Sequence, residues 1–381
     1  MSRGRGWQGA QELTVELDEP LPATAGPGDQ ERPRTVRALA YPQLVGDPQV
    51  GDRVLLNVSA LARGLGTGGY ALVVALPDTL PTDPPAGPGH LVKARYTPLQ
   101  ALVLGVDEQE SAHHDTLRDA DDLAGLPVVV ADLHRAATAG ASMRSAAAAW
   151  SGPRPPRTAY VMTDGGALPL AFSRTVAGLR EAGWLDATVT VGQAYGGDLE
   201  AVTVHTGLLA ARHVTGADLV VLTQGPGNLG TGTRWGFSGV AAGEALNAAA
   251  TLGALPVASL RISGADPRDR HLGISHHSLT AYGRVALAAS DVVVPRPTPE
   301  IEALPGWGAT LTARITEQAT HLAAPHGRHR LAHTETGTAL LDALRTTPVG
   351  LSTMGRGLDQ DPAAFLTAAA AGLHAERNRP A

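Results

Sequence analysis

Short apolar runs alternate with helix-length segments over most of the chain, and this alternation constrains the fold more than any other feature. The runs are apolar at successive positions, which is typical of strands covered on both faces. Repeated strand–helix units predict an α/β fold, a doubly wound, mostly parallel sheet with helices on both sides. A closed barrel of eight regular units is the alternative. The expected strands are 101–106, 127–131, 159–162, 187–191, 218–222, 256–260 and 291–294.

The segments between and after these strands have the length and composition of helices. Pro362 follows Asp361 and is typical of a first helical position. A basic stretch, 326–330, predicts a solvated loop near the end of the chain. The expected helices are 168–182, 199–213, 240–252, 279–288, 301–322, 335–345 and 362–374.

The first 80 residues have a different pattern, with short alternating strands and turns rich in Gly, Pro and Asp. The expected strands there are 13–17, 35–39, 53–58 and 70–76, and their spacing predicts a small barrel-like or sandwich domain. Five prolines and two glycines follow in 77–89, which indicates a linker. We therefore expect an all-β domain over 1–80, a linker over 81–89 and an α/β ligand-binding domain over 90–381.

Composition narrows the chemistry. The net charge is -6, which argues against a nucleic-acid partner bound through a basic surface. The chain has no cysteine, so disulfides, iron–sulfur clusters and cysteine nucleophiles are excluded. The N-terminus lacks the apolar segment of a secretory signal, and no apolar window is long enough for a membrane helix. We expect a cytoplasmic protein with no membrane partner, and a homodimer as the default assembly.

Chemically competent side chains follow nearly every expected strand. In open parallel sheets, ligands bind beyond the carboxyl ends of the strands, where such side chains converge. Acid–base or metal-binding chemistry is the functional interpretation, and ordinary polar loops are the alternative. The candidate catalytic residues at this edge are Asp107, Asp132, His134, Asp164, His276 and His277.

A glycine-rich loop follows the expected strand 218–222 and precedes a helix. Glycines permit close backbone approach, and free amides at a helix N-terminus bind anions such as phosphate. Its candidate ligand-binding residues are Gln224, Gly225, Gly227, Asn228, Gly230, Thr231, Gly232, Thr233 and Arg234, with Arg261 assisting from the next strand. The alternative is a tight loop whose glycines serve packing alone.

Other loops add ligand-binding candidates. Gly165 and Gly166 form a second glycine pair, and Gln193 follows another strand. Asp198 is either a helix N-cap or a functional carboxylate. Arg356, between two glycines, is suited to clamp an acidic group, or belongs to an ordinary turn.

The cofactor stays open at this point. The spacing of Gly225, Gly227 and Gly230 matches the glycine pattern of dinucleotide-binding motifs. The match follows a late strand, however, and Arg261 stands where an acidic residue would be wanted, so we do not expect NAD(P). A divalent metal would need His and Asp ligands, because cysteine is absent. The candidate metal ligands are His113, His114 and Asp115.

Several segments resemble an uncharacterised bacterial family, domain of unknown function 3866, over about residues 35–355. They are GHLVKARYTPLQALVLGVDEQES, YVMTDGGALP, GQAYGGDLEAVTVHTGLLAARH, GPGNLGTGTRWGFSG and ISHHSLTAYGRVAL. The resemblance implies a cytoplasmic bacterial protein and leaves the reaction open.

These observations favour an enzyme, a hydrolase or transferase, that acts on a phosphorylated or otherwise anionic small molecule at the carboxyl ends of the strands. A non-catalytic nucleotide or sugar-phosphate sensor with the same fold is the first alternative. A scaffold whose N-terminal domain docks a protein partner is the second.

Overall fold

The structure is a computed structural model that describes residues 1–21, 33–83, 87–134, 156–325 and 327–380. The chain divides into two compact units. One comprises Met1–Pro88 and Val92–Val103, and the other comprises Gly89–Leu91 and Leu104–Ala381. The predicted linker, 81–89, includes three residues outside the described ranges. The predicted domain boundaries stay predictions.

The N-terminal unit contains a mixed five-stranded sheet with short helices α1 (Pro42–Val45) and α2 (Ser59–Ala62). The strands, in spatial order, are β1 (Ser2–Trp7), β2 (Ala10–Glu16), β3 (Thr35–Ala40), β5 (Ala71–Ala75) and β4 (Leu55–Asn57). Only the β3–β5 pair is parallel. Leu13, Ala38 and Val73 are at the centre of its core. A separate two-stranded sheet joins β6 (Leu91–Lys93) and β7 (Ala101–Val103).

The second unit is built on an eight-stranded sheet in which every pair of neighbours is parallel. This arrangement confirms the predicted α/β fold. Its strands, in spatial order, are β11 (Leu199–Glu200), β10 (Ala187–Thr190), β9 (Thr158–Thr163), β12 (Leu219–Gln224), β8 (Pro127–Ala131), β13 (Leu255–Ser259), β16 (Asp291–Pro297) and β17 (Arg330–Thr336).

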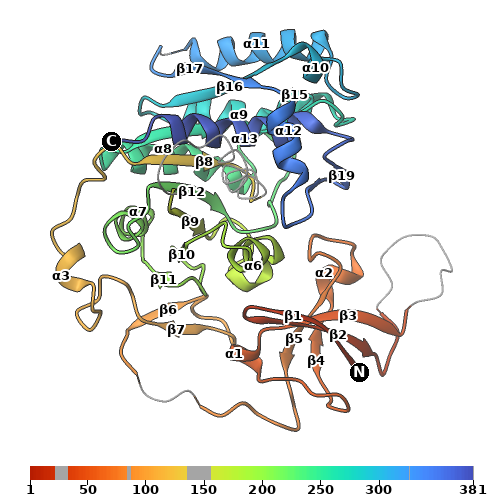
Figure 1. Cartoon of the computed structure of the whole chain (residues 1–381). Helices are drawn as coiled ribbons and strands as arrows, with labels where there is room; N and C mark the ends of the chain where they lie inside the picture. The colour runs from red at the N-terminus through yellow and green to blue at the C-terminus, as the bar shows by residue number, and fades with distance from the viewer. Residues whose placement is uncertain (22–32, 84–86, 135–155, 326, 381) are drawn as a thin grey trace. The chain divides into compact units, whose positions relative to one another are not determined.

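Helices cover both faces of this sheet. On β8, Val128 and Val130 belong to the core that α7 (Val204–His213) and α8 (Ala241–Thr251) also enter. Val129 between them packs with Ala370 of α13 (Pro362–Arg377). Because successive side chains of a strand point to opposite faces, α13 lies across the sheet from α7 and α8. Figure 1 shows α13 lying along β8 and β16.

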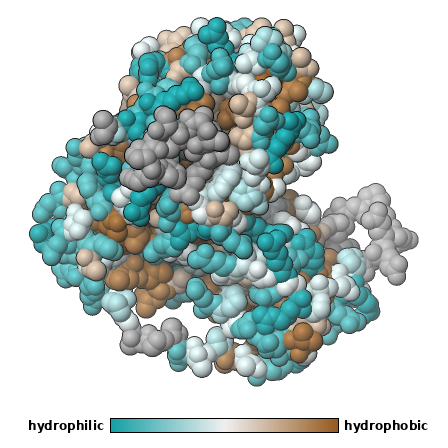
Figure 2. Space-filling model, viewed as in Figure 1, coloured by the Kyte–Doolittle hydropathy of each residue, from teal (hydrophilic) through white to brown (hydrophobic). Residues whose placement is uncertain are grey.

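Among its described residues, the second unit contains further elements besides three short 3-10 helices. They are α3 (His114–Leu117), α6 (Arg174–Glu181), β14 (Ile262–Ser263), β15 (Gly273–Ile274), α9 (His276–Thr280), a π-helical turn (Ala281–Val285), α10 (Pro299–Glu302), α11 (Ala309–Ala323), α12 (Thr338–Arg345), β18 (Ser352–Thr353) and β19 (Arg356–Gly357). On the face drawn in Figure 2, hydrophilic residues predominate, with hydrophobic patches between them. Within the described ranges, no helix combines the length and the apolarity needed to cross a bilayer.

Three sequence predictions need correction here. The apolar run 101–106 is not a strand of the large sheet, because β7 pairs with β6. The predicted helix 199–213 begins only at Val204, since Leu199 and Glu200 form the edge strand β11. The predicted basic loop, whose His326 lies outside the described residues, leads directly into strand β17, and its His329 is buried.

Gly243 allows α8 to lie against the π-helical turn. A Cβ at this position would meet the carbonyl oxygen of Ala281 and approach the Cβ of Val285 to 2.6 Å. We expect Gly243→Ala to destabilise the protein by about 1–2 kcal/mol, because overpacking outweighs the gain in helix propensity of up to ~1 kcal/mol. Denaturant unfolding measures the difference.

Gly350→Ala is the matched control, because nothing lies within 4 Å of the position that its Cβ would take. We expect that variant to unfold within about 0.5 kcal/mol of the wild type. A Gly243→Ala protein more stable than the wild type would show that the helices separate at little cost.

Candidate functional site

The register of the parallel sheet places several polar residues at one edge. Ala131, near the carboxyl end of β8, lies opposite Thr223 on one side and Ser259 on the other. The residues that follow, Asp132 and Gln224, therefore leave the sheet at the same level. Arg261 emerges two residues beyond Ser259. The predicted convergence at this edge is thus present for these three side chains.

A pocket opens at the carboxyl ends of β8 and β13. Asp132, Arg261, Ser263, Asp266 and Arg356 supply its polar lining. Ala364, Phe365 and Ala368 of α13 line it with apolar groups. A mixture of apolar walls with a few convergent polar groups is typical of small-molecule sites.

One wall of this pocket is a closed network of charges. Arg356 binds the carboxylates of Asp361 at 3.1 Å and Asp266 at 3.3 Å. Asp266 also pairs with Arg268 at 2.9 Å, and this hydrogen bonding lowers its pKa. Asp361 accepts hydrogen bonds from the hydroxyl of Ser263 and from a backbone amide. Arg356 does clamp acidic groups, as its position suggested, but they belong to its own chain.

Asp132 is the most unusual acid in the site. Its side chain is only 1% exposed, and its Oδ2 atom has no hydrogen-bond partner among the described residues. Burial raises its pKa to about 6, while the nearby charge of Arg261 opposes that rise. A carboxyl group with this pKa can both release and accept a proton near neutral pH.

Arg261 differs from Arg356 because no acid neutralises it directly. Its Nη1 donates a hydrogen bond to Nδ1 of His277 at 3.1 Å. Within the described part of the chain it forms no ion pair. Burial lowers its pKa, yet a guanidinium stays charged in proteins. A half-buried cation without a bound carboxylate is suited to meet an anion from solution.

A smaller pocket, which Asp132 also lines, lies beside the start of α8. Thr163, Gln224, Ser238 and Gly239 help to line it. Gly239 packs against Asp132, whose backbone oxygen would lie 3.0 Å from an added Cβ. The Oε1 atom of Gln224 is buried without a partner among the described residues. Asp132 therefore contributes to two adjoining cavities.

The glycine-rich loop folds back on itself beyond this smaller pocket. Gly230 bridges to Phe237, and the amide of Thr231 donates to the oxygen of Gly236 at 2.8 Å. The hydroxyl of Thr233 accepts from the amide of Gly236. Several amides expected to hold an anion are thus engaged within the loop. The ligand-binding role predicted for Gly225, Gly227, Asn228, Gly230, Thr231, Gly232, Thr233 and Arg234 stays a prediction.

The second glycine pair holds two loops together. A Cβ on Gly166 would meet the carbonyl of Gly225, and one on Gly165 would lie 3.2 Å from the Cβ of Gln224. Exposed Asp164 accepts the amide of Gln193 at 2.9 Å. Asp164, Gly165, Gly166 and Gln193 lie at the predicted edge. Their contacts join the ends of β9, β10 and β12.

His134 is also at this edge but points into a buried hydrogen-bonded chain. Its Nε2 lies 2.6 Å from the hydroxyl of Ser173, and its Nδ1 lies 2.7 Å from that of Tyr160. Tyr160 in turn bonds to Thr223 at 2.8 Å. Neither described pocket is lined by His134.

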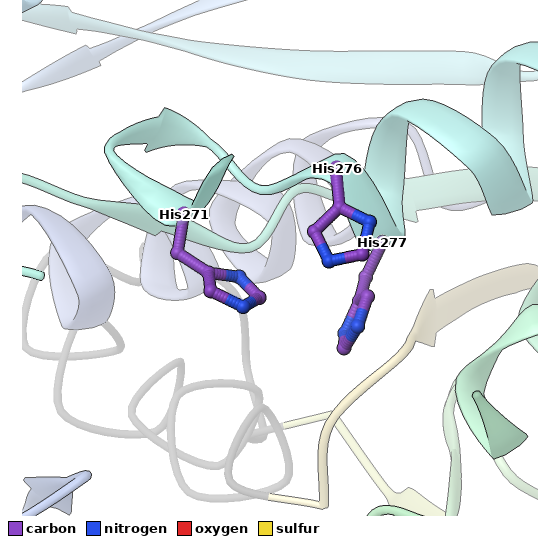
Figure 3. A group of neighbouring side chains, drawn as sticks. All are labelled: His271, His276 and His277. Atoms are coloured by element: carbon purple, nitrogen blue, oxygen red, sulfur yellow. The ribbon is translucent and has the colours of Figure 1, made fainter. Parts of the chain in front are cut away.

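Three histidines gather next to Arg261. His276 and His277 open α9, and His271 precedes β15. One ring nitrogen from each lies within 4.8 Å of those of the other two, and Figure 3 shows the rings close together. Burial, followed by the charge of Arg261, lowers the pKa of His271 to about 4 and that of His277 to about 3. Phe237 stacks flat on His277 at 3.9 Å.

The structure places the other candidates elsewhere. The segment before Asp107 pairs with Glu200 of the edge strand β11. Strand β11 itself lies four strands, about 19 Å, from β8. Asp198 lies level with Thr188 near the amino end of β10, so it does not face the carboxyl edge. It is not a helix N-cap, because Thr203 caps α7.

His113, His114 and Asp115 do not form a metal-ligating group in the described ranges. Asp115 is exposed and pairs with Arg118 at 2.7 Å. His114 bonds through Nδ1 to the backbone oxygen of Asp107. The histidine group that does exist includes His271, which follows the expected strand 256–260, as His276 and His277 do, but which no ligand spacing singled out. The sequence also gave no sign that Asp266 and Arg356 meet across 90 residues.

No curated protein and no solved structure matches this chain. A family model described as "Protein of unknown function (DUF3866)" matches residues 37–372, nearly the whole sequence. The match includes most of each unit, the two pockets and the three histidines. The chain therefore belongs to the DUF3866 family.

Proposed function

We propose that this protein is an enzyme, a hydrolase or transferase, that acts on a phosphorylated or otherwise anionic small molecule. One observation carries the proposal. A half-buried arginine that forms no ion pair with the described residues and a buried carboxyl group with a raised pKa line the same pocket. The first group supplies anion recognition, and the second supplies proton transfer.

Arg261 is the group that would bind the anion. Its guanidinium offers several N–H donors in a plane that matches phosphate or carboxylate oxygens. The other arginine of the pocket, Arg356, is already occupied by Asp266 and Asp361. An anion placed beside Arg261 would therefore gain a charge-assisted interaction without displacing an internal ion pair.

Asp132 is the group that would exchange the proton. It contributes to the larger pocket and to the smaller one. The larger pocket would hold the anionic substrate, and the smaller would admit water or a hydroxyl acceptor. A carboxyl between the two can take a proton from the attacking oxygen, which suits hydrolysis or group transfer better than redox chemistry.

Arg261→Gln should abolish most of the affinity for a simple anion. We expect inorganic phosphate and a nucleoside monophosphate to raise the melting temperature of the wild type, because ligands that bind only the folded state stabilise it. Loss of a charged hydrogen bond of about 1.5–3 kcal/mol should weaken binding at least tenfold. Thermal shift and calorimetry on the full chain measure both effects.

Arg284→Gln is the matched control, because Arg284 is exposed and lies in the same unit. It should bind these anions as the wild type does. Equal binding by the Arg261 variant would remove the basis for the anion site. A bound ligand that is never converted by the wild type, under any condition, would favour the sensor alternative.

Asp132→Asn should change how stability depends on pH. The pKa of Asp132 is raised from 3.8 to about 6, so between these values the folded protein holds a proton that the unfolded chain has released. Its stabilising contribution is present at low pH and is lost as the pH rises through 6. At ~1.4 kcal/mol per pKa unit, the wild type should lose roughly 3 kcal/mol relative to the variant between pH 4 and 7.

The comparison must be made between variants, because the buried histidines act in the opposite direction. Their lowered pKa values make the folded protein more stable as the pH rises. Asp115→Asn, at a side chain that is 85% exposed, is the control and should follow the wild type. Parallel curves for the wild type and Asp132→Asn, measured by urea unfolding, would show that Asp132 titrates normally.

A further inference from the structure

We propose that His271, His276 and His277 bind one divalent transition-metal ion beside Arg261. The three residues come from two elements, the segment before β15 and the first turn of α9. Their ligand nitrogens already lie within 4.8 Å of one another. Binding at this site does not depend on the proposed anion pocket.

The local backbone holds the three rings together. The hairpin of β14 and β15 returns the chain to Arg261, whose backbone oxygen accepts the amide of Ser275 at 2.8 Å. Ser275 caps α9 through the amide of His277 and also bonds to Nδ1 of His271 at 2.8 Å. One serine thus positions both ends of the histidine group, much as outer hydrogen bonds orient metal ligands in known sites.

His271 and His276 each have a ring nitrogen available to a metal. The bond of His271 to Ser275 uses Nδ1 and leaves Nε2 as the other ligand atom. The Nε2 atom of His276 is buried and has no hydrogen-bond partner among the described residues. An unpaired buried nitrogen of this kind costs free energy, which a metal bond would recover.

The ligand set also suggests the class of metal. Imidazole nitrogens suit Zn²⁺, Co²⁺, Ni²⁺ and Fe²⁺, whereas Mg²⁺ and Ca²⁺ prefer oxygen ligands. Three histidines leave at least one coordination position for water or for an oxygen of a ligand. Phe237, stacked on His277, covers one side of the group with an apolar ring.

A metal ion bound to His277 and the hydrogen bond from Arg261 to His277 cannot be present at the same time. Arg261 can only donate, so Nδ1 of His277 carries the lone pair and Nε2 carries the proton. A metal on Nδ1 would take that lone pair. A metal on Nε2 would require the proton on Nδ1, facing the arginine. In both cases Arg261 must leave His277, and it would then face the pocket that it already lines, a step that rests on the proposed anion site.

Co²⁺ titration of the full chain, produced without a histidine tag and stripped with a chelator, tests the site directly. We expect one Co²⁺ per chain with visible d–d absorption, and displacement of Co²⁺ by Zn²⁺. His276→Gln should weaken binding by more than about 100-fold, since even outer-shell changes cost 10–100-fold. His205→Gln, at an exposed residue of α7, is the control and should bind like the wild type.

Arg261→Gln supplies the second arm. Because it removes both a competitor for His277 and a nearby positive charge, it should tighten Co²⁺ binding by about tenfold, equivalent to ~1.4 kcal/mol. Unchanged or weaker binding would overturn the competition between Arg261 and the metal. Circular dichroism confirms that each variant is folded.

The outcomes separate this inference from the proposed function. No Co²⁺ binding by the wild type, or equal binding by folded His276→Gln, overturns the metal site. Phosphate binding to the chelator-treated protein, measured in parallel, would still stand in that case. Metal binding without any binding of phosphate or nucleotide would instead leave the metal site intact and count against the anion pocket.

Discussion

Hydrogen bonding between neighbouring parallel strands fixes the level at which β8, β12 and β13 end, and the site depends on that alignment. Ala131 faces Thr223 and Ser259, so the residues just beyond them emerge side by side. Asp132 and Gln224 are next along the chain, and Arg261 follows closely. A slip of β8 by one residue would turn its apolar side chains to the opposite faces of the sheet and move Asp132 away from both pockets.

The buried groups at this edge are held in an environment that opposes folding. Among the residues that the structure describes, the buried Oδ2 of Asp132 has no hydrogen-bond partner and Arg261 forms no ion pair. The rest of the unit offsets this cost with apolar packing on both sides of the sheet, centred on residues such as Val128, Val129 and Val130. The contrast with Arg356, Asp266 and Asp361, where every charge has a counterpart, indicates which part of the pocket is structural.

The sequence predicted the parts of this molecule that depend on short-range patterns. Strand β8 is apolar at every position and β12 is apolar over its first four residues, because both faces are covered, and the residues that end them could be assigned to one edge. Strand β17 was missed because it alternates polar and apolar residues, as an edge strand does. The run 101–106 was wrongly assigned to the large sheet because an apolar pattern does not show which strand it pairs with. His271 and Arg356 join the site through a hairpin and through distant ion pairs, which no local spacing encodes.

Phe237 connects the glycine-rich loop to the three histidines by stacking on His277. Its ring lies parallel to that of His277, with 6° between the planes. Any displacement of the loop would uncover one face of that imidazole and expose it to water. Conversely, a rotation of His277 would push on the loop that carries the exposed indole of Trp235. A change in the position of His277 should therefore alter the fluorescence of Trp235, which lies two residues before Phe237.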